Sequence, residues 1–309
     1  MIRTEAAQLD LRHWIHPGDD VVVGQGAAEP QTLSEALVRQ RLDLGGLSAF
    51  LGVQFTDTFI PGLCDGLSLR SMGGVGTNRR LVKAGLLDLL ACHQSQLPGF
   101  IETGVIGCDV ALVQVSPPDA QGRYRLSLGV DYIRTAVDQA RVVIAELNHA
   151  LPQVVCDGAL VEADIDVMVE TRRPLIQLAS APVGELERSI AAHVEAYIPD
   201  RATLQVGLGA IPEAIVAMLA NRQGLGVHSG MVGDSLVDLV ECGAVTNAHK
   251  GIDAGVSITG MLMGTDARLY RWARDNLALR VCGIRYTHTP RCSRACRASY
   301  RSIRRWKSI

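Results

Sequence analysis

The sequence predicts an α/β protein with two open, mostly parallel α/β domains, the second of them incomplete. Short aliphatic and β-branched runs alternate with segments of helical periodicity along most of the 309 residues. Apolar runs without polar alternation are typical of parallel strands that helices cover on both faces. Apolar residues make up 48% of the chain and aromatic residues only 4%, so the core is expected to be aliphatic.

The first half predicts three strands, each a run of Val, Ile, Leu or Ala, separated by helical segments. The strands are expected at 20–25, 109–116 and 141–147, and the helices at 29–44, 81–97 and 131–140. The second half repeats the alternation. Its expected strands are 203–209, 225–230 and 256–264, and its expected helices are 184–198, 212–223, 233–243 and 267–276. Three strand–helix pairs are few for a sheet of this kind.

A Pro-, Gly- and Ala-rich stretch, "LASAPVGE" at 178–185, separates the two alternating regions. Such a composition is typical of a connection between domains. The sequence therefore predicts a first domain over 1–183 and a second over 184–290, followed by an atypical tail over 291–309.

Charge and cysteine usage exclude some classes of protein. Residues 1–290 contain 23 basic and 32 acidic side chains, which gives no electrostatic footprint for nucleic acid. The first residues lack the apolar core of a signal peptide, and no apolar run is long enough to span a membrane. Six scattered cysteines, mostly in apolar stretches, are typical of buried thiols in a reducing compartment. We expect a cytoplasmic protein with no nucleic-acid or membrane partner.

The strongest chemical signal is "QVGLGAIPEAI" at 205–215, a glycine turn between a strand and a helix. Its glycines let backbone N–H groups approach a ligand, and Pro212 suits the first turn of a helix. The partial positive charge at the helix N-terminus favours a phosphate or a developing oxyanion. The alternative is an ordinary strand–helix turn. Two further glycine-rich turns, at 24–30 and 72–78, are weaker signals of the same kind.

Longer segments resemble a known family. "LQVGLGAIPEAI", "LGVHSGMVGDSLVDLVECGAVTNAHK" and "GVSITGMLMGTDARLYRWARDN" together look like the acetyl-CoA hydrolase/transferase family, which includes acetate, butyrate and 4-hydroxybutyrate CoA-transferases. In the first half, "GQGAAEPQTL", "DVALVQVSPPDAQGRYRLSLGVDY" and "RVVIAELNHALPQV" resemble the first domain of that family. The resemblance covers about 20–290, with the segments in the family's order.

The resemblance implies a two-domain enzyme of the CoA-transferase type that moves CoA from an acyl-CoA to a small carboxylate. In such enzymes a glutamate attacks the thioester and then carries CoA as a glutamyl thioester, which divides one difficult exchange into easier steps. By the same resemblance, Gly207, Leu208, Gly209, Ala210 and Ile211 would form the CoA-binding loop. CoA and acyl-CoA are then substrates, no cofactor or metal is bound permanently, and a homo-oligomer is expected.

The chain departs from the family at the nucleophile. The family motif has the form His-Ser/Thr-Glu-Met, and the matching residues are His228, Ser229, Gly230 and Met231. Gly230 stands where the family has its glutamate, and glycine has no side chain that could attack a thioester. The catalytic residue is therefore unknown from the sequence.

Two other carboxylates are weaker candidates for the nucleophile. Asp234 follows Gly230 by four positions, but it is expected to N-cap the next helix. Glu29 lies beside Pro30 in the first glycine turn. Glu213 is expected only to complement the dipole of its helix, and His228 to be a core or rim histidine.

The tail over 291–309 contains six Arg and one Lys without Asp or Glu. Tyr300 and Trp306 would suit a nucleic-acid-binding arm, and Cys292 and Cys296 with His288 a metal site that lacks a fourth ligand. The favoured interpretation is a shifted reading frame, because suitable codons read two bases later encode an apolar segment that the family has at this point. On this interpretation the second domain is truncated, which predicts an open sheet edge and poor solubility.

Three function hypotheses remain open. The favoured one is an acyl-CoA:carboxylate CoA-transferase, with acetate or a short-chain or hydroxy acid as acceptor, impaired by Gly230 and by the missing C-terminal part. The second is an acyl-CoA hydrolase, or a catalytically inactive CoA-binding protein. The third, an NAD-linked enzyme, requires an acidic residue about 20 positions after the glycine turn, and 222–233 offer none.

Overall fold

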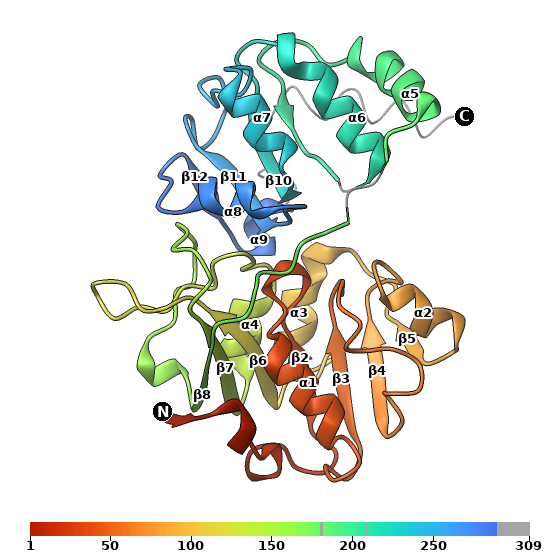
Figure 1. Ribbon diagram of the computed structural model, residues 1–309, viewed down its shortest axis with the longest axis vertical. Helices are drawn as coiled ribbons and strands as arrows, with labels where there is room; N and C mark the ends of the chain where they lie inside the picture. Colours follow the sequence, from red (N-terminus) through yellow and green to blue (C-terminus); the bar gives the residue numbers. More distant parts are fainter. Residues whose placement is uncertain (180–181, 208, 289–309) are drawn as a thin grey trace. The chain divides into compact units, whose positions relative to one another are not determined.

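The chain folds into two compact units that divide between Ile176 and Gln177 (Figure 1). The computed structural model describes residues 1–179, 182–207 and 209–288. The tail over 291–309, with Cys292, Cys296, Tyr300 and Trp306, lies outside these residues. Each unit is built on a parallel sheet, which confirms the predicted α/β class.

Eight parallel strands form the sheet of the first unit, in the order β1-β8-β7-β6-β2-β3-β4-β5. They are β1 (Ile2–Thr4), β2 (Asp20–Val23), β3 (Leu47–Leu51), β4 (Leu67–Ser71), β5 (Leu87–Leu89), β6 (Val110–Val115), β7 (Val142–Asn148) and β8 (Val167–Thr171). The chain runs outward from β2 to β5 and then returns to the other side of β2 with β6. The boundary between β2 and β6 is therefore the topological switch point, where open α/β sheets bind ligands beyond the carboxyl ends of their strands.

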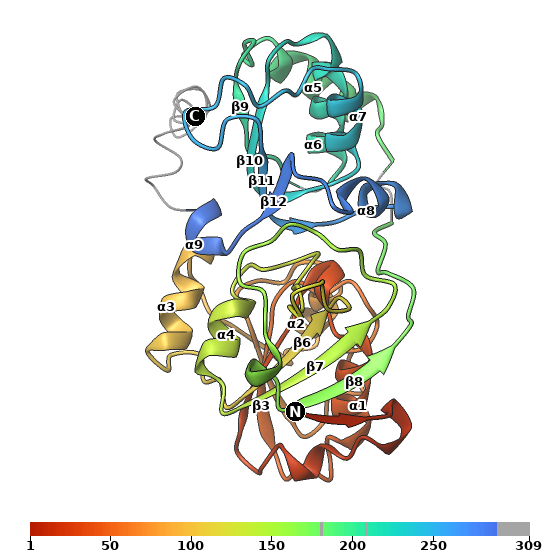
Figure 2. The same ribbon diagram turned by 90° about the vertical axis from the view of Figure 1, so that its left-hand side faces the viewer.

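Helices cover both faces of this sheet (Figure 2). They are α1 (Gln31–Gln40), α2 (Asn78–Lys83), α3 (Leu97–Glu102) and α4 (Ile133–Gln139). On the face of α1, Leu33 and Leu37 belong to one buried cluster with Val21, and nearly all of its members are aliphatic, as predicted. On the face of α3 and α4, the rings of Phe50 and Tyr132 meet edge to face with centroids 5.6 Å apart.

The helix predicted over 81–97 is wrong. Helix α2 ends at Lys83, and the next apolar residues form the edge strand β5. Gly85 has φ of +69°, a left-handed conformation that ends helices. Leu87 then pairs with Leu69 of β4. The apolar residues of this segment belong partly to α2 and partly to β5. Pairing with β4 overrides the local helix propensity of the second part.

The second unit has a four-stranded parallel sheet in the order β12-β11-β10-β9. Its strands are β9 (Thr203–Leu204), β10 (Gly226–Val232), β11 (Ser257–Leu262) and β12 (Leu279–Val281). Its helices are α5 (Glu185–Glu195), α6 (Ala210–Met218), α7 (Ser235–Glu241), α8 (Ala267–Ala273) and α9 (Ile284–Thr287). Figure 2 shows α6 and α7 on one side of this sheet and α9 on the other. The strand β12 and the helix α9 were not predicted.

The strand predicted over 203–209 is too long, because β9 ends at Leu204. Beyond that point the hydroxyl of Ser229 accepts from the N–H of Val206 and donates to its carbonyl oxygen, both at 3.0 Å. The Ser229 hydroxyl thus replaces the backbone hydrogen bonds that would continue the pairing of β9 with β10. The chain is then free to leave the sheet and enter the glycine turn.

Candidate active site

The predicted glycine turn lies at the carboxyl end of β9 and leads into α6. Gly209 has φ of +124°, a conformation that residues with a Cβ rarely adopt, and Pro212 lies in the first turn of the helix. Gly207, Ala210 and Ile211 are part of the same turn and helix start, and Ile211 is 40% exposed. Leu208, the fifth residue of the predicted CoA-binding loop, lies outside the described residues. The turn therefore presents backbone at the start of a nine-residue helix.

The turn and the family motif lie side by side. Ser229 belongs to the motif in β10, and its hydroxyl holds Val206, the residue before the turn. The two segments are linked by this side chain because β9 and β10 are parallel neighbours whose carboxyl ends meet at one edge. The second unit thus brings Gly230 next to the glycine turn.

Gly230 faces a second glycine. In the register of β10 and β11, Gly230 lies opposite Gly260. The short helix α9 packs over this pair, and the imidazole of His288 follows it. A Cβ atom at position 230 would lie 2.3 Å from Cε1 and 2.6 Å from Nε2 of His288. The imidazole therefore occupies the space in which a side chain of residue 230 would begin.

His228 lies on the same face of β10, and 6% of it is exposed. Its Nε2 is 3.4 Å from the carbonyl oxygen of Tyr286 in α9. The centroids of the His228 and Tyr286 rings are 5.7 Å apart. Burial lowers the pKa of His228, and the buried ammonium of Lys250 lowers it further. Among the described residues, Nδ1 of His228 has no hydrogen-bond partner. His228 was expected to be a core or rim histidine with its hydrogen bonds satisfied. Only Nε2 has such a hydrogen-bond partner among the described residues.

Asp234 does not cap its own helix with its side chain, contrary to the prediction. Its carboxylate accepts from the N–H and the hydroxyl of Thr265, at 2.6 and 2.9 Å, and from the N–H of Leu269 at 3.3 Å. The carboxylate thus ties the start of α7 to the start of α8. These contacts arise because both helices begin at the same edge of the sheet, so a neighbouring terminus competes for the cap.

Glu213 lies in the first turn of α6, as expected for a residue that complements the helix dipole. Its Oε1 approaches Gly233, in the turn after β10. A Cβ atom added to Gly233 would lie 3.3 Å from this oxygen. Burial raises the pKa of Glu213, although Ser235 hydrogen-bonds to it, and the nearby charges of Asp234 and Asp238 also raise it. This carboxylate reaches the β10 turn, which the sequence did not predict.

Glu29 lies in the other unit, beyond β2 at the switch point, and is fully buried. The hydroxyl of Thr56 donates to its two carboxylate oxygens, at 2.9 and 2.8 Å. Nε2 of Gln114 donates to its backbone carbonyl at 2.6 Å. Burial raises the pKa of Glu29 to about 7, against the effect of the Thr56 hydrogen bond. A carboxyl group with such a pKa can exchange a proton near neutral pH, but this one is enclosed by protein.

Two further buried carboxyl groups lie near the carboxyl edge of this sheet, and the sequence did not predict them as a group. Glu146 in β7 accepts from the N–H of Thr32 at 2.7 Å and from the hydroxyl of Thr171 at 3.1 Å. Asp131, ahead of α4, accepts from the amide of Gln25. Burial raises the pKa of both, that of Asp131 to about 7. The sequence segment "RVVIAEL" contained a signal for the buried Glu146, because this acidic residue interrupts an otherwise apolar strand.

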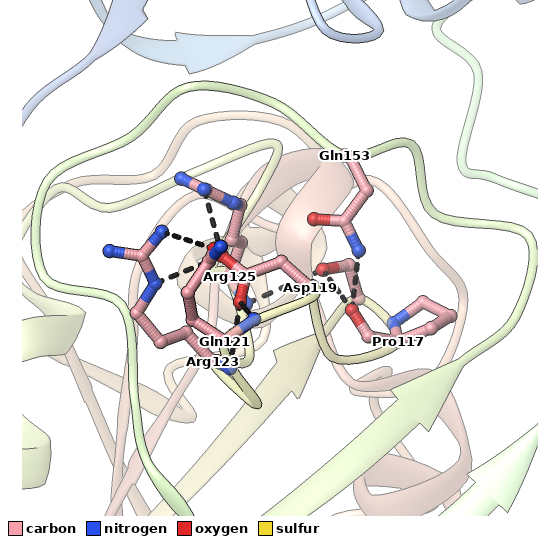
Figure 3. Close-up of polar contacts among 7 residues, drawn as sticks. Pro117, Asp119, Gln121, Arg123, Arg125 and Gln153 are labelled. Carbon is pink, nitrogen blue, oxygen red and sulfur yellow. Dashed lines mark hydrogen bonds and ion pairs between the residues drawn. The ribbon is translucent and has the colours of Figure 1, made fainter.

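The loop after β6 is held in place by Asp119 (Figure 3). Its carboxylate accepts from the N–H of Arg123 at 3.0 Å and pairs with the guanidinium groups of Arg123 and Arg125, at 2.9 and 3.0 Å. Nε2 of Gln153 donates to the carbonyl oxygen of Pro117 at 2.5 Å. These contacts order a segment that begins at the switch point of the first unit.

In the part of the chain that the structure describes, no group of three or more His, Cys, Asp and Glu side chains could hold a metal ion. Across residues 1–179, 182–207 and 209–288, no helix combines the length and apolar composition needed to cross a bilayer.

Two parallel α/β units, with a glycine turn beside a strand motif in the second, define a protein of the CoA-transferase type. Comparison with known proteins agrees. Residues 64–184 match the acetyl-CoA hydrolase/transferase N-terminal domain. The chain belongs to the acetyl-CoA hydrolase/transferase family.

Relatives with assigned activities are CoA-transferases. The 4-hydroxybutyrate coenzyme A transferase of Clostridium kluyveri is 31% identical over 87% of this chain and 63% of its own length. The butyryl-CoA:acetate CoA-transferase of Anaerostipes caccae is 27% identical over 89% of this chain and 63% of its own length. The chain thus spans less than two thirds of the length of these relatives.

Solved structures agree on the fold. RipA from Yersinia pestis has a TM-score of 0.85 and 26% identity, and the match covers 93% of this chain and 69% of that one. The 4-hydroxybutyrate CoA-transferase from Porphyromonas gingivalis has a TM-score of 0.79 and 25% identity, over 94% of this chain and 70% of that one.

Proposed function

We propose that the chain binds the CoA moiety of an acyl-CoA at the glycine turn 207–211, and that transfer of CoA to a small carboxylate is impaired in it. The observation that carries this proposal is the link between Ser229 and Val206, which sets the turn beside the motif at Gly230. The turn offers backbone N–H groups and a helix N-terminus, which suit the phosphates of CoA. The named activities of the relatives favour a short-chain acyl group, with acetate or a short hydroxy acid as the acceptor.

Impairment is expected because position 230 carries no nucleophile. A glutamyl thioester requires a carboxylate that reaches the bound thioester, and Gly230 supplies none. The imidazole of His288 also fills the space next to Gly230. A carboxylate restored at this position must therefore displace His288 before it can reach a substrate.

CoA binding is tested by titration calorimetry on the complete chain. Gly209→Ala forces a Cβ into the left-handed conformation of the turn, so we expect at least about tenfold weaker CoA binding. Gly243→Ala is the matched control, because Gly243 also has a positive φ of +81° and its Cβ would meet no atom within 4 Å. The glycine turn is not the binding element if both variants bind CoA equally well.

The missing nucleophile is tested with Gly230→Glu, alone and together with His288→Ala. We expect the double variant to exchange CoA between butyryl-CoA and acetate, and the single variant to be much less active because His288 obstructs the new side chain. Gly230→Gln with His288→Ala is the matched control without a carboxylate. No exchange by the double variant, with CoA binding intact, would point to a nucleophile elsewhere.

A further inference from the structure

His288 is placed where a reacting group would stand. Its Nε2 lies 2.6 Å from the Cβ position of residue 230, at the end of the motif strand that adjoins the glycine turn. Gly230 and Met231 are partly exposed, whereas His228, Ser229 and Val232 are buried, so solvent reaches β10 at Gly230 and Met231. His288 itself is also partly exposed.

The hydroxyl of Thr287 contacts Nδ1 of His288, the ring nitrogen other than the one beside Gly230. The hydroxyl of Thr287 donates to the carbonyl oxygen of Ile284 at 3.5 Å. Its oxygen lies 2.8 Å from Nδ1 of His288, and while the hydroxyl donates to Ile284 this oxygen can accept from a protonated Nδ1. In the neutral tautomer that carries its proton on Nδ1, Nε2 keeps its lone pair, and Nε2 is the nitrogen next to Gly230.

The surroundings favour the neutral ring at physiological pH. Burial lowers the pKa of His288 from its ordinary value of 6.5. The titratable neighbours on this side of the sheet include His228 from β10 and Tyr286 from α9. Lys250 and Asp253, from the segment before β11, act on His228. A neutral imidazole with a free Nε2 is the form of histidine that accepts a proton.

We propose that Nε2 of His288 is a general base that activates water to hydrolyse an acyl thioester held beside Gly230, so that the chain is an acyl-CoA hydrolase. This inference rests on the proposed CoA binding. An O–H bond of water breaks as its proton passes to Nε2, and the water oxygen bonds to the thioester carbonyl carbon. The C–S bond then breaks, and the CoA sulfur takes the proton from the imidazolium. The products are a free carboxylic acid and the CoA thiol.

The competing explanation is packing alone, in which His288 only fills the space that two facing glycines leave. A packing role would affect stability but would not create a pH profile in the rate. The experiment therefore measures hydrolysis and CoA affinity separately on the complete chain.

Thiol release from acetyl-CoA and butyryl-CoA is followed for the wild-type chain and for His288→Gln, which retains a side chain of similar size. General-base catalysis contributes typically ~10²–10⁴-fold, so we expect kcat/KM to fall at least about 100-fold with the Kd for CoA unchanged. In the wild type, kcat/KM should rise with pH to a plateau with a midpoint below 6.5, the ordinary histidine value, and this step should be absent from the variant. His193→Gln, an exposed histidine in α5, is the matched control and should hydrolyse at the wild-type rate.

Thr287 is a positioning residue in this mechanism. Thr287→Val should lower kcat with KM unchanged and alter the pH profile, and Thr287→Ser should restore both. CoA binding without hydrolysis in the wild type, or a wild-type rate in His288→Gln, would overturn this inference alone. A wild-type chain that does not bind CoA would overturn the proposed function as well.

Discussion

Glu29 illustrates how the fold changes the properties of a single residue. The side chain lies at the switch point, excluded from water, and its main hydrogen bonds come from the hydroxyl of Thr56. Burial raises its pKa from 4.5 to about 7, so the folded chain holds a proton that the unfolded chain releases. Between these two values the stability contributed by Glu29 falls as pH rises, because only the unfolded state is ionised there.

Glu29→Gln should therefore stabilise the protein at high pH. Gln is neutral and can still accept from Thr56, so the variant should gain about 3 kcal/mol above pH 7 and nothing below pH 4. Urea unfolding at pH 4, 6 and 8 measures the difference. Glu162→Gln, at an exposed site, serves as the control and should show no pH-dependent gain. Equal gains at pH 4 and pH 8 would contradict the linkage to burial.

Gly52 is the second residue whose surroundings determine its identity. A Cβ at this position would lie 2.1 Å from Oε1 of Gln25 and 2.5 Å from the hydroxyl of Tyr132. We expect Gly52→Ala to cost about 1–3 kcal/mol in the free energy of unfolding, as overpacked cores do. Gly99→Ala in helix α3 meets no atom within 4 Å and should instead gain about 0.5–1 kcal/mol. The urea midpoints of Gly52→Ala and Gly99→Ala should shift in opposite directions. Shifts in the same direction would contradict the expected difference between the two sites.

At the scale of elements, helix starts are joined to one another rather than capped independently. Asp234 joins the start of α7 to Thr265 and Leu269 at the start of α8. Asp234→Ala should cost about 1–3 kcal/mol, because Thr265 loses its acceptor, and it should speed hydrogen exchange at the two amides. Asp238→Ala removes only an exposed ion pair with Arg268 and should cost less than about 1 kcal/mol. Unchanged exchange at Leu269 in Asp234→Ala would show that the contact does not stabilise α8.

In the first unit the sequence predicts three strands correctly, β2, β6 and β7, which are neighbours at the centre of the sheet. β6 and β7 consist mostly of apolar residues, and every residue in them is buried. β4 and β5 have exposed Ser, Arg and Asp side chains, so no apolar run marks them. The sequence therefore located the centre of the first sheet and missed the strands on both sides of it, β3, β4 and β5 on one side and β1 and β8 on the other.

The candidate site was predictable only in part, for a related reason. The glycine turn was visible because glycines and a proline mark it locally. The approach of His288 to Gly230 depends on the packing of α9 over two facing glycines, which no local pattern records. The same holds for Asp234, whose true partners belong to another helix.

At the scale of the whole molecule, the first unit contains a complete sheet. All eight strands, from β1 to β8, lie within residues 1–176, and so does the large buried cluster under α1. Residues 1–176 alone should therefore fold and melt cooperatively. Near-UV circular dichroism and a thermal scan check this, with 1–109 as the control that lacks β6, β7 and β8 and should not fold. A 1–176 fragment without a cooperative transition would mean that the first unit depends on the second.

The buried carboxyl groups of the first unit have a thermal consequence. Near pH 6 Glu29 and Asp131 hold their protons in the folded chain, since burial raises the pKa of each to about 7. Unfolding exposes both groups to water, and the released protons are taken up by the buffer. The calorimetric heat of unfolding should then depend on the buffer, with a larger difference between phosphate and imidazole at pH 6 than at pH 8.5. These two carboxyl groups would in this sense act as acids when the protein melts.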